Sequence, residues 1–241
     1  MSGFSDGWRW RELVGLVALG ALLLVLGRVP YASMAVYPFR LFGTFVHELS
    51  HGMAALATGG HFQRFTVSPD LSGLAWSAGG IRAIVSSAGY VGSAIFGGLL
   101  ILLGSRGLSA RVLLTALGLL LGALCLAFVR NPFGIVTGLM LASAVFLAGR
   151  KLREPWSDLL LLILALQLVF DGFNSMLTLF WLSGNSAVQT DALSMQQATG
   201  IPAIVWAIVW MLMSAGILVM TLMLAYRGRT RLAQGTAGQV Q

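Results

Sequence analysis

The chain has 241 residues, of which 57% are hydrophobic and only 10% charged, and it carries a net charge of +7. Because a soluble domain usually carries about 25% charged residues, this composition excludes a water-soluble globular protein and favours an integral membrane protein in a lipid bilayer. The basic residues flank apolar segments, as at 150–153 and 227–231, which is typical of orientation signals and headgroup contacts and argues against a nucleic-acid partner.

Seven apolar segments of about membrane-spanning length follow one another along the chain. They cover approximately residues 13–27, 36–58, 81–103, 112–129, 133–148, 159–182 and 202–226. No small-residue cleavage pattern follows the first segment, so we interpret it as a membrane helix and not as a removed signal peptide. Pro132 and Pro202 are expected at the starts of helices, where proline is tolerated.

These segments predict the fold class and the domain organisation. We expect an all-α polytopic membrane protein with six to seven transmembrane helices and a single domain over residues 1–241. Its core is expected at 36–182, its C-terminal helix at about 202–226 and a disordered tail at 227–241. The single Cys125 lies within an apolar segment, so a disulfide framework and a cysteine-based metal site are both excluded.

The stretch between the second and third apolar segments has the pattern of a β-hairpin. Phe62, Arg64, Thr66 and Ser68 alternate with Gln63, Phe65 and Val67, a turn signal occupies 69–73, and a second short run covers 74–77. We therefore predict a short hairpin at the membrane surface, with an irregular loop as the alternative.

Counting basic residues over seven spans places the C-terminus on the cytoplasmic side of the membrane. We predict that this membrane is a bacterial cytoplasmic membrane. Ten basic residues then lie with the C-terminus and five on the other side: Arg9, Arg11, Arg64, Arg82 and Arg130. This count leaves Arg9 and Arg11 outside. Either the N-terminus is outside, or one segment does not fully cross the membrane.

The motif His47-Glu48-Leu49-Ser50-His51 concentrates ionisable groups within the second apolar segment. On a helix, positions i and i+4 lie about 40° apart around the axis, so both imidazoles project from one face and can bind one Zn²⁺. Glu48 is placed to act as the general base toward water. Polar side chains bonded between helices are the structural alternative, but ionisable groups within a membrane usually indicate function.

Two histidines leave zinc in need of a third protein ligand. Asp171 is the preferred candidate, because it lies deep in an apolar segment where an uncompensated carboxylate is costly. Gln167 and Asn174 are on the same helical face and are candidates for hydrogen-bonding Asp171, and Asn174 also for an oxyanion donor. Asp191, in the polar loop 183–200, is the alternative third ligand. The third histidine, His61, follows Gly59-Gly60 and is interpreted as a surface residue.

These motifs together resemble the site-2 protease family of intramembrane zinc metalloproteases, and in particular its compact bacterial branch. The resemblance spans residues 36–182, and its motifs are His47-Glu48-Leu49-Ser50-His51-Gly52, Gly59-Gly60, residues 87–92 and Phe170-Asp171-Gly172. It implies that His47, His51 and Asp171 bind zinc and that Glu48 activates water. The family's usual Asn and Pro ahead of Asp-Gly are missing here, and the chain has no PDZ module.

The sequence therefore predicts a zinc-dependent intramembrane endopeptidase that cuts membrane-spanning or membrane-anchored proteins. A non-proteolytic scaffold or chaperone with the same fold is the first alternative, although a structural metal site would not need Glu48. A small transporter is the second, although comparing the two halves by eye reveals no internal repeat. The sequence leaves the oligomeric state open.

Overall fold

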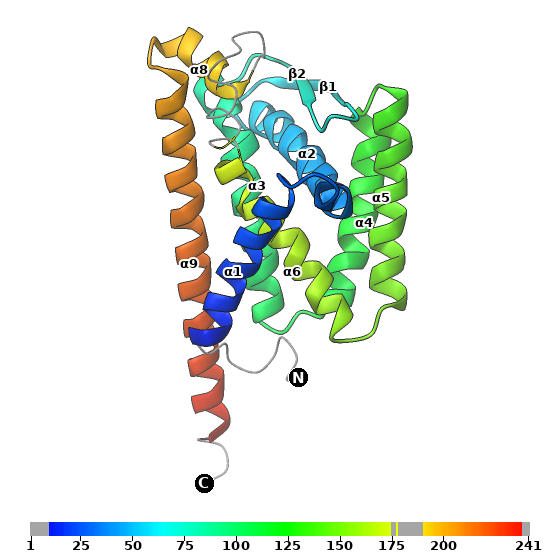
Figure 1. Cartoon of the computed structure of the whole chain (residues 1–241), viewed down its shortest axis with the longest axis vertical. Helices are drawn as coiled ribbons and strands as arrows, with labels where there is room; N and C mark the ends of the chain where they lie inside the picture. The colour runs from blue at the N-terminus through cyan, green and yellow to red at the C-terminus, as the bar shows by residue number, and fades with distance from the viewer. Residues whose placement is uncertain (1–9, 175–176, 178–189, 238–241) are drawn as a thin grey trace.

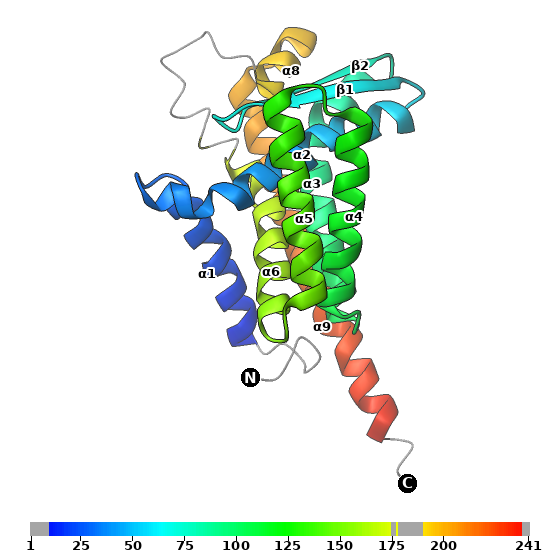
Figure 2. The same ribbon diagram turned by 90° about the vertical axis from the view of Figure 1, so that its right-hand side faces the viewer.

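The computed structural model describes residues 10–174, 177 and 190–237. Its core is a bundle of apolar helices capped at one end by a two-stranded sheet and a short helix (Figures 1 and 2). In chain order the elements are α1 (Trp10–Leu26), α2 (Ala32–Ala57), β1 (His61–Val67), β2 (Gly73–Ala78), α3 (Arg82–Ser105), α4 (Ala110–Phe128), α5 (Pro132–Lys151), α6 (Trp156–Val169), α8 (Asp191–Thr199) and α9 (Ala203–Ala237).

Four of the described helices, α3, α4, α5 and α9, are long and apolar enough to cross a membrane, while α1 and α6 are shorter apolar helices. The protein is thus an integral membrane protein in composition, and the expected number of six to seven spans stays a prediction. Helix α2 carries Arg40 and the motif histidines. It lies obliquely between α1 and the hairpin, as Figure 2 shows.

The predicted β-hairpin is present. β1 and β2 pair antiparallel from His61↔Ala78 to Val67↔Gly73, with an irregularity between Phe62 and Arg64. The turn is held on α2, because the Tyr37 hydroxyl donates to the carbonyl of Pro69 (2.8 Å) and the Thr44 hydroxyl to that of Leu71 (3.0 Å). These bonds fix β2 above the middle of α2.

The outer edge of β1 is closed by the connection between α4 and α5. Phe65 forms a parallel bridge with Val129. The Asn131 side chain accepts from the backbone N–H of Val67 (3.2 Å) and donates to its carbonyl (2.7 Å), so it pairs with β1 as a neighbouring strand would. In the part of the chain that the structure describes, β2 has β1 as its one strand partner.

The sixth predicted segment differs from the expected single helix over 159–182. Helix α6 ends at Val169, a turn follows at Phe170, and residues 171–174 are helical again. The physical reason is local: Phe173 bonds back to the carbonyl of Phe170 (3.1 Å), an i to i−3 contact that reorients the chain at Asp171. Most of the predicted remainder lies outside the described residues.

The last helix also differs from its predicted bounds. Helix α9 continues to Ala237, past residue 226, where the sequence predicted that a disordered tail begins. Adding residues to a helix that has already formed is easier than starting one, so the apolar part of α9 can extend the helix through residues 227–231, where arginine alternates with glycine and threonine. Helix α8, in the polar loop 183–200, was not predicted.

Candidate metal centre

Helix α2 presents both motif histidines from one face, as the four-residue spacing predicts. The ring centroids of His47 and His51 lie 4.8 Å apart with the ring planes at 77°. His51 and the intervening Glu48 are buried to 6% relative exposure. Three ionisable side chains on one buried face need compensating partners, because burying an uncompensated charge is costly.

One nitrogen of each ring is held by an oxygen acceptor. Nδ1 of His51 lies 2.6 Å from the backbone carbonyl of Val85, which can only accept, so this nitrogen carries the proton. Nδ1 of His47 lies 2.7 Å from Oδ2 of Asp171. When each Nδ1 donates, the Nε2 of each neutral ring is left with a lone pair, the form in which histidine binds metal.

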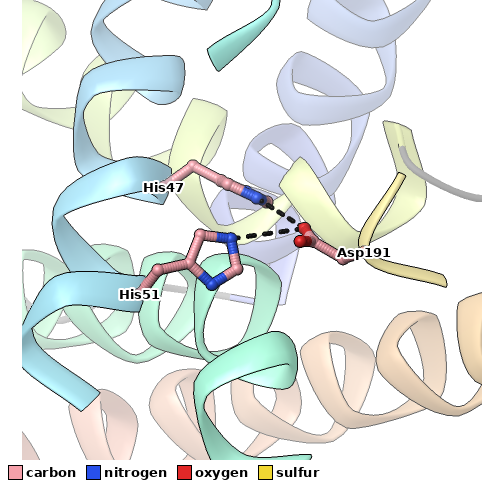
Figure 3. A group of neighbouring side chains, drawn as sticks. All are labelled: His47, His51 and Asp191. Carbon is pink, nitrogen blue, oxygen red and sulfur yellow. Dashed lines mark hydrogen bonds and ion pairs between the residues drawn. The ribbon is translucent and has the colours of Figure 1, made fainter. Parts of the chain in front are cut away.

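The two Nε2 atoms converge on one carboxylate oxygen (Figure 3). Oδ2 of Asp191 lies 3.0 Å from Nε2 of His47 and 3.3 Å from Nε2 of His51. Three potential ligand atoms, one from each residue, all lie within 4.8 Å of one another. Burial alone would raise the pKa of Asp191, but protonated imidazoles of His51 and His47 beside it lower that pKa well below its ordinary value.

This donor set fits a zinc ion. Two ligand atoms at about 2.0–2.1 Å from a tetrahedral zinc are about 3.3 Å apart, close to the separations of Asp191 from the two imidazoles. Two lone pairs and a carboxylate that face one another with no cation between them repel. Two imidazoles and one carboxylate are also a known ligand set of catalytic zinc, which leaves a fourth position open.

Two glycines make room for these side chains. A Cβ added at Gly89 of α3 would overlap the imidazole of His47, and one added at Gly73 of β2 would overlap the carboxylate of Glu48. Helix α3 can therefore lie against the first histidine, and β2 against the acid. Further along α3, Ser93 is fully buried, and a Cβ added at Gly97 would come within 2.5 Å of the carbonyl oxygen of Ala165, so the four-residue spacing of small residues supports close packing.

A second, smaller apolar cluster holds α8 in place. It consists of the buried Ala192, Met195 and Trp210, with Tyr90 packed against it. The Tyr90 ring stacks on Trp210 with the centroids 4.9 Å apart, and its centroid lies 4.5 Å from that of His47. Asp191 is thus brought to α2 through contacts of α8 with α3 and α9.

The histidines, Glu48 and Asp191 line an open cleft of about 650 Å³ under the hairpin. Gly73, Leu74, Ala75 and Ser77 of β2 form one wall of it. The turn is ordered by Asp70, which accepts from the hydroxyl of Ser72 (2.6 Å) and from its backbone N–H (3.0 Å). These bonds lower the pKa of Asp70.

A comparison with models of protein families matches residues 13–221 to the family described as Peptidase M50B-like. The chain belongs to this family. The match confirms the predicted resemblance to the site-2 proteases, whereas the assignment to their compact bacterial branch stays a prediction. No curated protein and no solved structure shows significant similarity to the chain.

Within this M50B-like chain, the two aspartates are placed differently from the order in which the sequence analysis ranked them as third ligands. Asp171, the preferred third ligand, contacts Nδ1 of His47, on the side of the ring away from Asp191. Asp191, the alternative, is grouped with both Nε2 atoms. A turn that is not visible in the sequence decides this geometry, since the break at Phe170 directs Asp171 to the back of the first histidine.

The other predicted residues are close to the centre with differing contacts. Gln167 is buried and lines the cleft. Asn174 also lines the cleft and accepts hydrogen bonds from Arg28, through its side-chain oxygen at 2.7 Å and its carbonyl at 3.1 Å. His61 begins β1 and is exposed, as predicted.

Sequence reasoning missed the roles of Tyr90 and Gly73 in the M50B-like site. Tyr90 belongs to the family motif at residues 87–92, but its ring contact with His47 follows from the packing of α3 on α2. Gly73 was assigned only to a turn signal. Counting the register of the hairpin would pair Gly73 with Val67, but it would not reveal that Gly73 lies above Glu48.

Proposed function

We propose that this protein is a zinc-dependent intramembrane endopeptidase and that His47, His51 and Asp191 hold the metal. One observation carries the proposal. The Nε2 atoms of both histidines face a single Asp191 oxygen, while their Nδ1 atoms are occupied by Asp171 and the carbonyl of Val85. Membership of a metallopeptidase family supports the same conclusion.

When bound, zinc supplies Lewis-acid activation of a water molecule and of the scissile carbonyl. Glu48 is the general base: it accepts a proton from the attacking water and passes it to the departing amine. Its position beside His47 on α2 and beneath Gly73 of β2 holds its carboxylate in the cleft. Asp171 orients His47 by accepting its Nδ1 proton.

We propose that the substrate is a membrane-spanning or membrane-anchored protein that enters the cleft in extended form. The support comes from the hairpin, whose β1 edge is closed by Val129 and Asn131. Strand β2 lines the cleft and has β1 as its one strand partner among the described residues. An extended segment can add to such an edge through main-chain hydrogen bonds, which brings its amides over Glu48.

The experiment that tests this function compares the wild-type chain with Glu48→Gln. Both are purified in one detergent, and their zinc content and cleavage of a panel of single-span reporter proteins are measured. We expect equal zinc and a loss of cleavage by several orders of magnitude in the variant, because the amide cannot accept the proton. Equal cleavage by the two proteins would refute the mechanism.

A further inference from the structure

Basic residues are distributed unequally between the two ends of the helical bundle. Among the residues that the structure describes, the end with the hairpin and α8 has three, which lie in the hairpin, at the start of α3 and in the α4–α5 connection: Arg64, Arg82 and Arg130. The opposite end has nine among the described residues: Arg11, Arg106, Arg111, Arg150, Lys151, Arg153, Arg227, Arg229 and Arg231.

Contacts between elements establish which connections share an end. The α4–α5 connection is at the hairpin end, because Val129 and Asn131 pair with β1. The α3–α4 and α5–α6 connections are at the other end, where the Arg111 guanidinium of α4 donates to the carbonyl of Arg150 of α5 (3.0 Å). The start of α1 and the end of α9 also lie at this second end (Figure 1).

The path of α1 and α2 removes the difficulty that the sequence count left open. Helix α1 starts at the end opposite the hairpin, and α2 continues obliquely from it to the hairpin (Figure 2). The two helices together make a single passage from one end to the other. Arg28 and Arg40 lie at their junction and bond to Asn174 and to the carbonyl of Gly27, so they belong to neither end.

From this distribution we infer that the cleft opens on the extracytoplasmic side of the membrane and accepts substrate segments that are exposed there. Cytoplasmic loops carry the excess of lysine and arginine, and the rule applies best to short loops such as 106–109 and 152–155. The basic end is therefore cytoplasmic, with the C-terminus. The hairpin, α8 and the candidate metal centre lie toward the outer face.

Aromatic residues near both ends are consistent with this placement. Trp76 of β2 lies under the guanidinium of Arg64, 4.9 Å from the ring centroid, and Trp156 at the start of α6 is 64% exposed. Tryptophan is enriched at membrane–water interfaces. The hairpin therefore lies at one interface and the α5–α6 connection at the other, so the wall of the cleft formed by β2 is at headgroup level.

The inference also narrows the substrate class, and this part rests on the proposed peptidase function. An extended segment can reach β2 only where it emerges from the bilayer beside the hairpin. The substrate is then a membrane-anchored chain with an unfolded stretch directly outside its anchor. A stretch on the cytoplasmic side of the same anchor would lie at the opposite end of the bundle from Glu48.

Cysteine labelling tests the orientation without requiring activity. In a Cys125→Ala background, Gln63→Cys places a thiol on the exposed part of β1, and Leu108→Cys places one in the α3–α4 connection, where Leu108 is 44% exposed. With a membrane-impermeant maleimide, we expect Gln63→Cys to be labelled in intact cells and Leu108→Cys only after permeabilisation. The reverse pattern, or equal labelling of both in intact cells, would overturn the inference.

A pair of reporters tests the substrate side. Each has one membrane span and the same unfolded segment, placed outside the span in one and inside it in the other. We expect cleavage of the outer reporter alone, and cleavage of the inner one alone would overturn the inference. Absence of cleavage of both reporters by the wild-type chain would count against the proposed peptidase, whereas the labelling, repeated with the inactive Glu48→Gln variant, decides the orientation independently of activity.

Discussion

Asp171 and Asp191 bind opposite nitrogens of the same imidazole. Oδ2 of Asp171 lies 2.7 Å from Nδ1 of His47, and Oδ2 of Asp191 lies 3.0 Å from its Nε2. One carboxylate can therefore fix the tautomer of the ring, while the other faces the nitrogen lone pair that a metal would take. A carboxylate behind a ligating histidine raises its basicity and fixes its orientation.

This division of roles predicts unequal effects of the two aspartates on metal binding. Asp191→Ala should lose nearly all zinc, as should His47→Ala, because each removes a ligand. Asp171→Asn should keep about one zinc per chain with affinity reduced about tenfold, since its amide oxygen still accepts from Nδ1. Competition with a chromophoric chelator measures both affinities. Zinc retained in Asp191→Ala but lost in Asp171→Asn would restore Asp171 as the ligand.

A second prediction concerns the contact between α3 and α2. Gly89→Ala should displace the imidazole of His47, because the new methyl group overlaps it. We expect zinc occupancy to fall at least severalfold and cleavage to fall with it, while the helical circular-dichroism signal is kept. Gly216→Ala is the matched control, since nothing lies within 4 Å of a Cβ there. Normal zinc occupancy in Gly89→Ala would contradict this prediction, because it would show that α2 and α3 can move apart without disturbing the metal centre.

The attachment of β1 to the α4–α5 connection gives a third prediction. Asn131→Ala removes two hydrogen bonds to the backbone of Val67, a loss of about 1–3 kcal/mol of local stability. Amide hydrogen exchange over residues 61–78 should accelerate accordingly, and kcat/KM should fall. Thr137→Ala loses one bond inside α5 (2.7 Å) and serves as the control. Unchanged exchange in the hairpin would mean that α2 alone holds it.

A fourth prediction tests how Asp191 is delivered to the histidines. Met195→Ala cuts back a side chain that is 1% exposed between α8 and α9, a change that typically costs about 2–5 kcal/mol. Because α8 is a short helix, this loss should release it, and zinc occupancy should drop as it does in Asp191→Ala. The exposed Gln197→Ala, on the same helix, should bind zinc normally. A fully zinc-loaded Met195→Ala would contradict the role given to the α8 cluster.

Local features of this protein were predictable because they depend on neighbours along the chain. Apolar composition indicates the membrane, alternation between Phe62 and Ser68 indicates a strand, and a four-residue spacing places His47 and His51 on one face whatever the helix packs against. Pro132 begins α5 for an equally local reason: its missing N–H would have no partner at that position.

The tertiary structure alone decided which carboxylate meets which nitrogen. Asp171 and Asp191 are both acidic residues late in the chain. Hydropathy favoured Asp171, because it shows how deep a residue lies within an apolar segment. It does not show in which direction the side chain points where the helix is broken. The turn at Phe170 points Asp171 behind His47, and contacts of α8 with Tyr90 and Trp210 bring Asp191 to the front. Such contacts join residues more than 100 positions apart, so their energy has no signature in any local pattern.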